Sequence, residues 1–148
     1  MSTKDNDPNQ ARSAETGRHR QLYKNNGLTK TQLETREHVL RSLRAFVALV
    51  APQRLIGHCQ EEMLKEFADY EVSHVLALLP RGHQKSIMIA YFVAWHIIRN
   101  PDTTIIYASA TAGLAEAQLS IIKQILDNPV LRKYFPELLE EDTGRRTM

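Results

Sequence analysis

Apolar side chains recur at helical spacing in the first part of the sequence. A capping box, Thr31-x-x-Glu34, opens a run with this spacing, and Pro52 ends it. After Gly57 a second run places apolar residues on one face and charged residues on the other. The pattern therefore predicts two amphipathic helices that pack on one core and make up a helical region over residues 27–70.

The pattern then alternates between strand-like and helix-like segments. Residues 75–79 form a continuous apolar run, which is typical of a strand buried on both faces of a parallel sheet. A helical pattern covers residues 85–99, and residues 103–109 are rich in β-branched side chains. A last helical pattern runs from about residue 114 to residue 126, and its expected buried stripe consists of Leu114, Leu119, Ile122 and Ile125 or Leu126. This order predicts a βαβα unit with parallel strands.

Composition narrows the class of protein only slightly. The chain has 148 residues, 43% hydrophobic and 24% charged, which fits one ordinary globular domain. Residues 1–26 contain few large apolar side chains, so we expect a flexible, disordered polar arm there. The net charge of +2 does not decide between classes of partner. Cys59 is the only cysteine and no apolar run is long enough to span a bilayer, so we expect a soluble protein of the cytoplasm without a membrane partner.

The 79–86 loop, Leu-Pro-Arg-Gly-His-Gln-Lys-Ser, lies between a predicted strand and a predicted helix. A phosphate loop occupies such a place: backbone N–H groups converge on phosphate oxygens, a lysine reaches the β and γ phosphates, and a serine or threonine holds magnesium. Lys85 and Ser86 stand at those two positions. Both glycines of the common pattern G-x-x-x-x-G-K-[ST] are missing, because Leu79 and Gln84 replace them. A strand-to-helix turn with a surface lysine and a serine cap is therefore the alternative.

Residues 78–86, 94–101 and 105–116 together resemble the large terminase subunits of tailed phages. Those proteins carry a deviant phosphate loop, R-G-x-x-K-[ST], and a second core strand that ends in S-A-T. The resemblance extends over about residues 53–139. It implies an α/β fold, a P-loop NTPase-type parallel sheet flanked by helices. The sheet would be incomplete here, with residues 71–148 as the start of the ATPase core.

The resemblance also implies a role for each residue of the 79–86 loop. Arg81 would approach the γ phosphate of ATP, although a surface arginine at the rim of the sheet is the alternative. Ser86 would hold magnesium together with the nucleotide. The residues that would form the phosphate loop are Gly82, His83, Gln84, Lys85 and Ser86.

Two further sites follow from the same resemblance. Gln60 would match an upstream glutamine that contacts adenine, although a solvent-facing glutamine at a helix start is the simpler interpretation. Ser109 and Thr111 would belong to a motif that couples nucleotide state to DNA. Thr111 is explained equally well as the cap of the following helix.

The implied function is that of an ATP-driven motor that packages viral DNA into procapsids in the cytoplasm of the bacterial host. Its cofactors would be ATP and Mg²⁺. Its partners would be double-stranded DNA, the portal protein, the small terminase subunit and further copies in a ring, and a carboxyl-terminal endonuclease would follow. Hydrolysis needs acidic residues at a strand end, whereas the late cluster of Glu137 and Glu140–Glu141–Asp142 follows no strand-forming run, so we expect this chain alone to be inactive. The alternatives are a non-catalytic DNA- or partner-binding fragment and a fragment of another P-loop or helicase-like ATPase.

Overall fold

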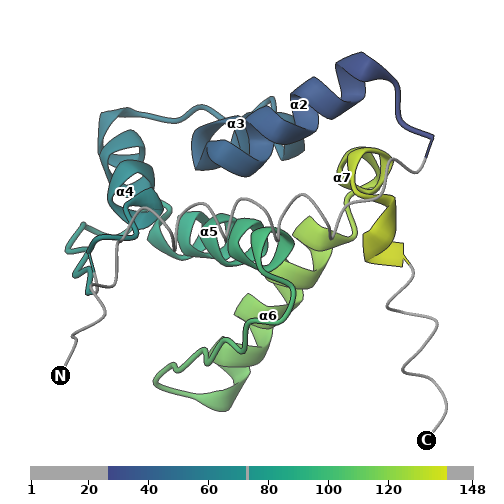
Figure 1. The fold of residues 1–148 in the computed structure, drawn as a ribbon. Coiled ribbons are helices and arrows are strands. Elements are labelled where there is room, and N and C mark those ends of the chain that lie inside the picture. Colours follow the sequence, from purple (N-terminus) through teal and green to yellow (C-terminus); the bar gives the residue numbers. More distant parts are fainter. Residues whose placement is uncertain (1–26, 73, 140–148) are drawn as a thin grey trace, which may run out of the picture.

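The computed structural model describes residues 27–72 and 74–139, and this part of the chain is helical (Figure 1). The expected polar arm and residues 140–142 of the late acidic cluster lie outside it. The elements, in chain order, are α2 (Lys30–Arg41), α3 (Leu43–Val50), α4 (His58–Ala68), α5 (Lys85–Arg99), α6 (Ala112–Leu126), α7 (Pro129–Tyr134) and the 3₁₀-helix η1 (Pro136–Leu139).

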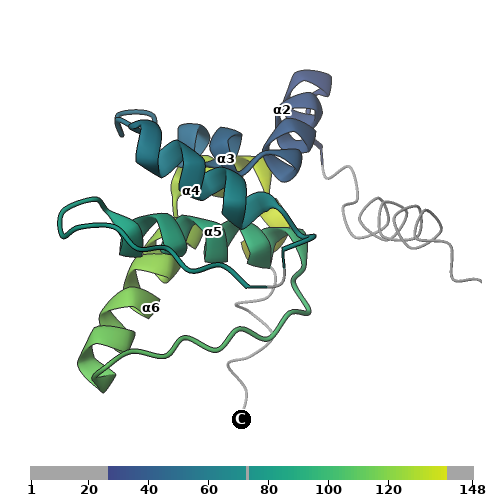
Figure 2. The ribbon, with the colours of Figure 1, turned by 90° about the vertical axis from the view of Figure 1, so that its left-hand side faces the viewer.

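Helix α5 is the centre of the packing. It contacts α2, α3 and α4 on one side and α6 on the other (Figures 1 and 2). A helix surrounded in this way must be apolar around most of its circumference, and its buried residues are Met88, Ala90, Tyr91, Val93, Ala94, Trp95 and Ile98. The indole N–H of Trp95 donates to the carbonyl oxygen of Val39 at 2.8 Å, which ties α5 to α2 inside the core.

The predicted first helix is two helices in the structure. Ser42 is extended, with φ −132° and ψ 113°, and separates α2 from α3. Its hydroxyl accepts from the N–H of Ala45 at 3.2 Å and so restarts the helix. The capping box is also displaced: it joins Thr29 to Gln32 rather than Thr31 to Glu34. The apolar spacing continued across the break, so periodicity alone did not reveal it.

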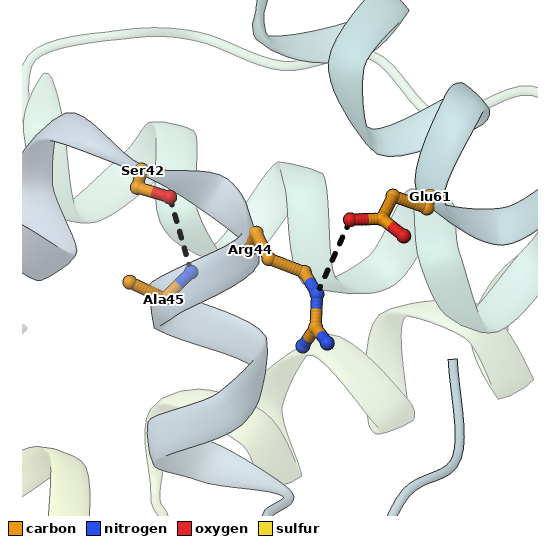
Figure 3. A network of polar contacts seen from close by, with 4 residues as sticks. All are labelled: Ser42, Arg44, Ala45 and Glu61. Atoms are coloured by element: carbon orange, nitrogen blue, oxygen red, sulfur yellow. Dashed lines mark hydrogen bonds and ion pairs between the residues drawn. The ribbon is translucent and has the colours of Figure 1, made fainter. Parts of the chain in front are cut away.

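Helices α3 and α4 pack side by side. An ion pair joins Arg44 on α3 to Glu61 on α4 at 4.0 Å (Figure 3). Both side chains are about half exposed, so the pair contributes less than about 1 kcal/mol. The buried side chains of Met63 and Leu64 contribute more to the packing of α4 on the core, because each removes a large apolar surface from water.

The α/β prediction is wrong for the described chain, because no β-strand forms between residues 27 and 72 or between residues 74 and 139. Residues 74–80 and 103–109 are extended, and Figure 2 draws each as a separate trace without an arrow. Leu76 and Leu78, which we expected to be buried, are 82% and 80% exposed. Residues that favour a strand become one only when a neighbouring segment pairs with their backbone, and here the two segments do not pair. The described residues therefore do not form the parallel P-loop sheet.

The carboxyl-terminal helices depart from the predicted pattern in two details. On α6, Ile122 and Ile125 are buried as expected, whereas Leu114 and Leu119 are 56% and 46% exposed. The second detail is α7 itself, which follows the last predicted helix: Pro129 occupies its first turn, since proline is compatible with a helix start.

Candidate functional site

The 79–86 loop leads from an extended segment into the first turn of α5. Two of its residues have positive φ: Gly82 at 87° and Gln84 at 57°. A Cβ atom added to Gly82 would meet nothing within 4 Å, so glycine serves there for its backbone conformation and not for space. Gln84 is left-handed, with ψ 25°, which costs about 1–2 kcal/mol for a residue with a side chain. Turns that use such conformations can direct successive N–H groups towards an anion.

The N-cap side chain does not hydrogen-bond to the backbone N–H groups at the start of α5. Gln84 is the N-cap, its side chain makes no capping hydrogen bond, and the first turn of α5 contains no acidic residue. The N–H groups of a first helical turn carry the positive end of the helix dipole. An anion at this end of α5 would therefore meet favourable backbone charge without a competing carboxylate from that turn.

Lys85, the first residue of α5, folds back over the loop. Its ammonium group donates to the carbonyl oxygen of Leu79 and to that of Pro80, the latter at 3.2 Å. Arg81 and Ser86 are exposed, and the Nδ1 atom of His83 lies 3.4 Å from the Arg81 carbonyl oxygen. The loop thus carries three polar groups within six residues of sequence: the Lys85 ammonium, which is bound to backbone carbonyls, the exposed Arg81 guanidinium and the exposed Ser86 hydroxyl.

Gln60 contacts the loop from α4. Its side-chain amide nitrogen Nε2 donates to the carbonyl oxygen of His83 at 3.3 Å. In the described structure Gln60 is therefore half-buried against the loop rather than free in solvent. Gly57 leaves room for it, because a Cβ atom there would lie 2.9 Å from the Gln60 Oε1 atom.

Arg54 is a residue of the site that the sequence analysis missed. Its Nη1 atom donates to the Oε1 atom of Gln84 at 2.5 Å, and its Nε atom donates to the Tyr91 hydroxyl at 3.1 Å. The guanidinium carbon also lies 5.6 Å from the centroid of the Tyr91 ring. Arg54 stands 30 residues before Gln84, in the connection between α3 and α4, and no local pattern there marks it as part of the loop.

Ser109 and Thr111 lie at the other predicted position, before α6. Both are exposed, and the hydroxyl of Thr111 accepts from the N–H of Leu114 at 3.4 Å. Thr111 is thus the N-cap of α6. The hydrogen bonds of the described chain do not join either residue to the 79–86 loop.

A second polar cluster lies near the carboxyl end of α5. The Tyr70 hydroxyl is 2.9 Å from the Nδ1 atom of His96, and the two rings stack with centroids 5.8 Å apart. The Arg99 guanidinium lies over the rings of Trp95 and Tyr70, at 4.4 Å and 4.7 Å. Burial lowers the pKa of His96, and the positive charge of Arg99 lowers it further. This cluster fastens the segment after α4 to α5.

Within residues 27–72 and 74–139, no group of three or more His, Cys, Asp or Glu side chains is placed to hold a metal ion. No helix in the same part of the chain is long and apolar enough to cross a membrane. Comparisons of the chain with protein-family models, with curated proteins and with solved structures found no match.

Proposed function

We propose that the 79–86 loop binds the phosphates of a nucleoside triphosphate, and that the chain is the amino-terminal part of a large terminase subunit. One observation carries the proposal. The Lys85 ammonium group folds over a loop with two positive-φ residues, directly at the start of a helix that no side chain caps. Backbone N–H groups, a helix dipole and a lysine are the combination that binds phosphate in proteins.

In this proposal each residue of the loop has a separate task. Lys85 exchanges its two carbonyl acceptors for β- and γ-phosphate oxygens, and the exposed Arg81 contacts the γ phosphate. Gly82, His83 and Gln84 shape the backbone around the phosphates. Ser86 holds the magnesium ion of Mg-ATP through its exposed hydroxyl. Magnesium would supply charge neutralisation on the phosphates.

The parent motor would use this nucleotide to move double-stranded DNA, as a ring of copies in contact with the portal protein and the small terminase subunit, inside the bacterial host. The proposal for this chain is limited to binding, since its sequence contains no strand-like run that ends in paired acidic residues. We expect no ATP turnover by the chain alone.

A second candidate function is that of a non-catalytic fragment that binds a protein partner. The observation in its favour is apolar exposure: Leu76, Leu78 and Ile106 are 80% to 89% exposed on the two extended segments. Large apolar side chains that are exposed to solvent are candidates for a surface that another polypeptide covers. This candidate does not require nucleotide, and that difference separates the two.

Calorimetric titration of the chain with Mg-ATP tests the proposal. We expect measurable binding by the wild type, its loss in Lys85→Ala, and no change in Lys123→Ala, which removes an equal charge from an exposed position on α6. Equal affinities of wild type and Lys85→Ala would refute the phosphate-loop assignment. Absence of binding by the wild type would leave the partner-binding fragment as the better interpretation.

A further inference from the structure

The Arg54 side chain makes hydrogen bonds both to a buried residue of α5 and to Gln84, the N-cap residue of the same helix. Tyr91 lies in the second turn of α5 and is 4% exposed, so the surrounding core holds its side chain in place. Arg54 donates to that hydroxyl through Nε and to the Gln84 side chain through Nη1. A guanidinium group holds two acceptors in a rigid planar geometry, so the position of Gln84 is set relative to the helix interior.

Gln84 needs such a restraint. It is the non-glycine residue of the described chain with positive φ, and the left-handed conformation is unfavourable for a residue with a Cβ atom. A strained backbone conformation persists only where surrounding contacts enforce it. The Gln60 side chain, which also contacts the loop, donates to the carbonyl of His83 and not to Gln84.

We propose that Arg54 is a positioning residue: it holds Gln84 in its left-handed conformation and thereby keeps the N–H groups of the first turn of α5 in place for an anion. The part of this inference that concerns the anion rests on the proposed function. The part that concerns the shape of the cap does not. Arg54 acts through Gln84, since the 2.5 Å hydrogen bond engages the guanidinium with that side chain.

A double-mutant cycle distinguishes positioning from direct contact with the anion. Glycine adopts positive φ without strain, so Gln84→Gly makes the restraint unnecessary. With pyrophosphate as the probe, Arg54→Ala should weaken binding about five- to thirtyfold, which corresponds to the strain that it releases. In the Gln84→Gly background the same change should alter affinity less than about twofold. Arg44→Ala removes an equal charge on α3 and is the control, with affinity unchanged.

Amide hydrogen exchange gives a readout that needs no ligand. The N–H of Met88 donates to the carbonyl oxygen of Gln84 at 3.0 Å, so its exchange rate reports whether the cap is in place. Arg54→Ala should accelerate this exchange, Arg44→Ala should not, and Gln84→Gly should cancel the effect of Arg54→Ala.

The two experiments test anion binding by the loop and the positioning role of Arg54 separately. Failure of the wild type to bind pyrophosphate would refute the proposed function, while the exchange of the Met88 amide would still decide whether Arg54 positions the cap. An equal loss of pyrophosphate affinity on Arg54→Ala in both backgrounds would show that Arg54 contacts the anion directly, and would overturn the positioning role. Unchanged Met88 exchange in Arg54→Ala would overturn it as well.

Discussion

The ammonium group of Lys85 donates a hydrogen bond to the carbonyl oxygen of Pro80, five residues earlier, at 3.2 Å. The same group donates to the Leu79 carbonyl, so the cation of the 79–86 loop is bound by its own backbone. An ammonium group has three N–H donors, so a phosphate that accepts from more than one of them must replace at least one of these carbonyl oxygens. Its binding free energy is therefore the difference between two sets of charge-assisted hydrogen bonds, and not the full value of the new set.

This exchange predicts an order of affinities among inorganic anions. Tripolyphosphate should bind more tightly than pyrophosphate, and pyrophosphate more tightly than orthophosphate, because a longer anion can satisfy Lys85 and still reach the exposed Arg81. All three should bind more weakly as salt is raised, since these charges are partly exposed. Calorimetric titrations at two salt concentrations measure both trends. Equal affinities for the three anions would contradict a site that uses more than one cation.

Adjacent leucines of the extended segment should respond differently to truncation. Leu78 is 80% exposed, whereas Leu79 is partly buried and packs against the core. We predict that Leu79→Ala lowers the free energy of unfolding by about 1–2 kcal/mol and that Leu78→Ala changes it by less than about 0.5 kcal/mol. Urea denaturation of the two variants provides the comparison. Equal losses would mean that both side chains are buried, as the sequence pattern predicts.

Replacement of Trp95 by phenylalanine should destabilise the fold. The change removes the donor to the Val39 carbonyl and leaves a cavity at a side chain that is 1% exposed. We expect a loss of about 2–3 kcal/mol in the free energy of unfolding, measured by circular dichroism because Trp95 is the only tryptophan. Leu55→Ala is the control: Leu55 is 91% exposed and should contribute less than about 0.5 kcal/mol. A loss no greater than that of the control would refute the buried hydrogen bond.

Stability should fall as the solution becomes acidic, and His96 should account for part of the loss. Its pKa in the folded chain is below the ordinary value of 6.5, because burial and Arg99 both disfavour the charged imidazole. The unfolded chain then binds the proton more readily. The stabilisation is thus complete above pH 6.5 and is lost as the pH falls from there through the lower pKa of the folded state.

The measurement is the urea midpoint at about pH 7.5 and about pH 5.5, for wild type and His96→Gln. The drop between the two pH values should be smaller in the variant, because glutamine does not titrate. The two proteins differ only at residue 96, so contributions from the rest of the chain cancel in this comparison. An equal drop in both proteins would remove His96 as a source of the pH dependence.

The sequence predicted helices better than it predicted strands, for a physical reason. A helix satisfies its backbone within one segment, so α5 could be inferred with its observed bounds, 85–99. The break at Ser42 escaped notice because one hydroxyl-to-backbone bond decides it, while the apolar spacing continues. A strand depends on a partner segment, and the apolar run at residues 75–79 contains no information about whether that partner is present.

The residues of the candidate site could likewise be predicted only in part. The 79–86 loop could be singled out because the residues that mark it are neighbours in sequence. Thr111 had two open interpretations, and the structure shows the one in which it caps a helix. Arg54 could not be found, since its link to Gln84 joins residues 30 apart. The contact of Gln60 with the His83 carbonyl is likewise a product of how α4 packs, and a single sequence gives no sign of it.

The most direct test of the proposal that the 79–86 loop binds phosphate is a titration of the ¹⁵N-labelled chain with pyrophosphate, in which the chemical shifts of the backbone amides are followed. We predict that the largest changes occur at Gly82, Lys85 and Ser86 and that they vanish in Lys85→Ala. Shifts centred on another part of the chain, or the same shifts in wild type and Lys85→Ala, would contradict the assignment of this loop as the anion site.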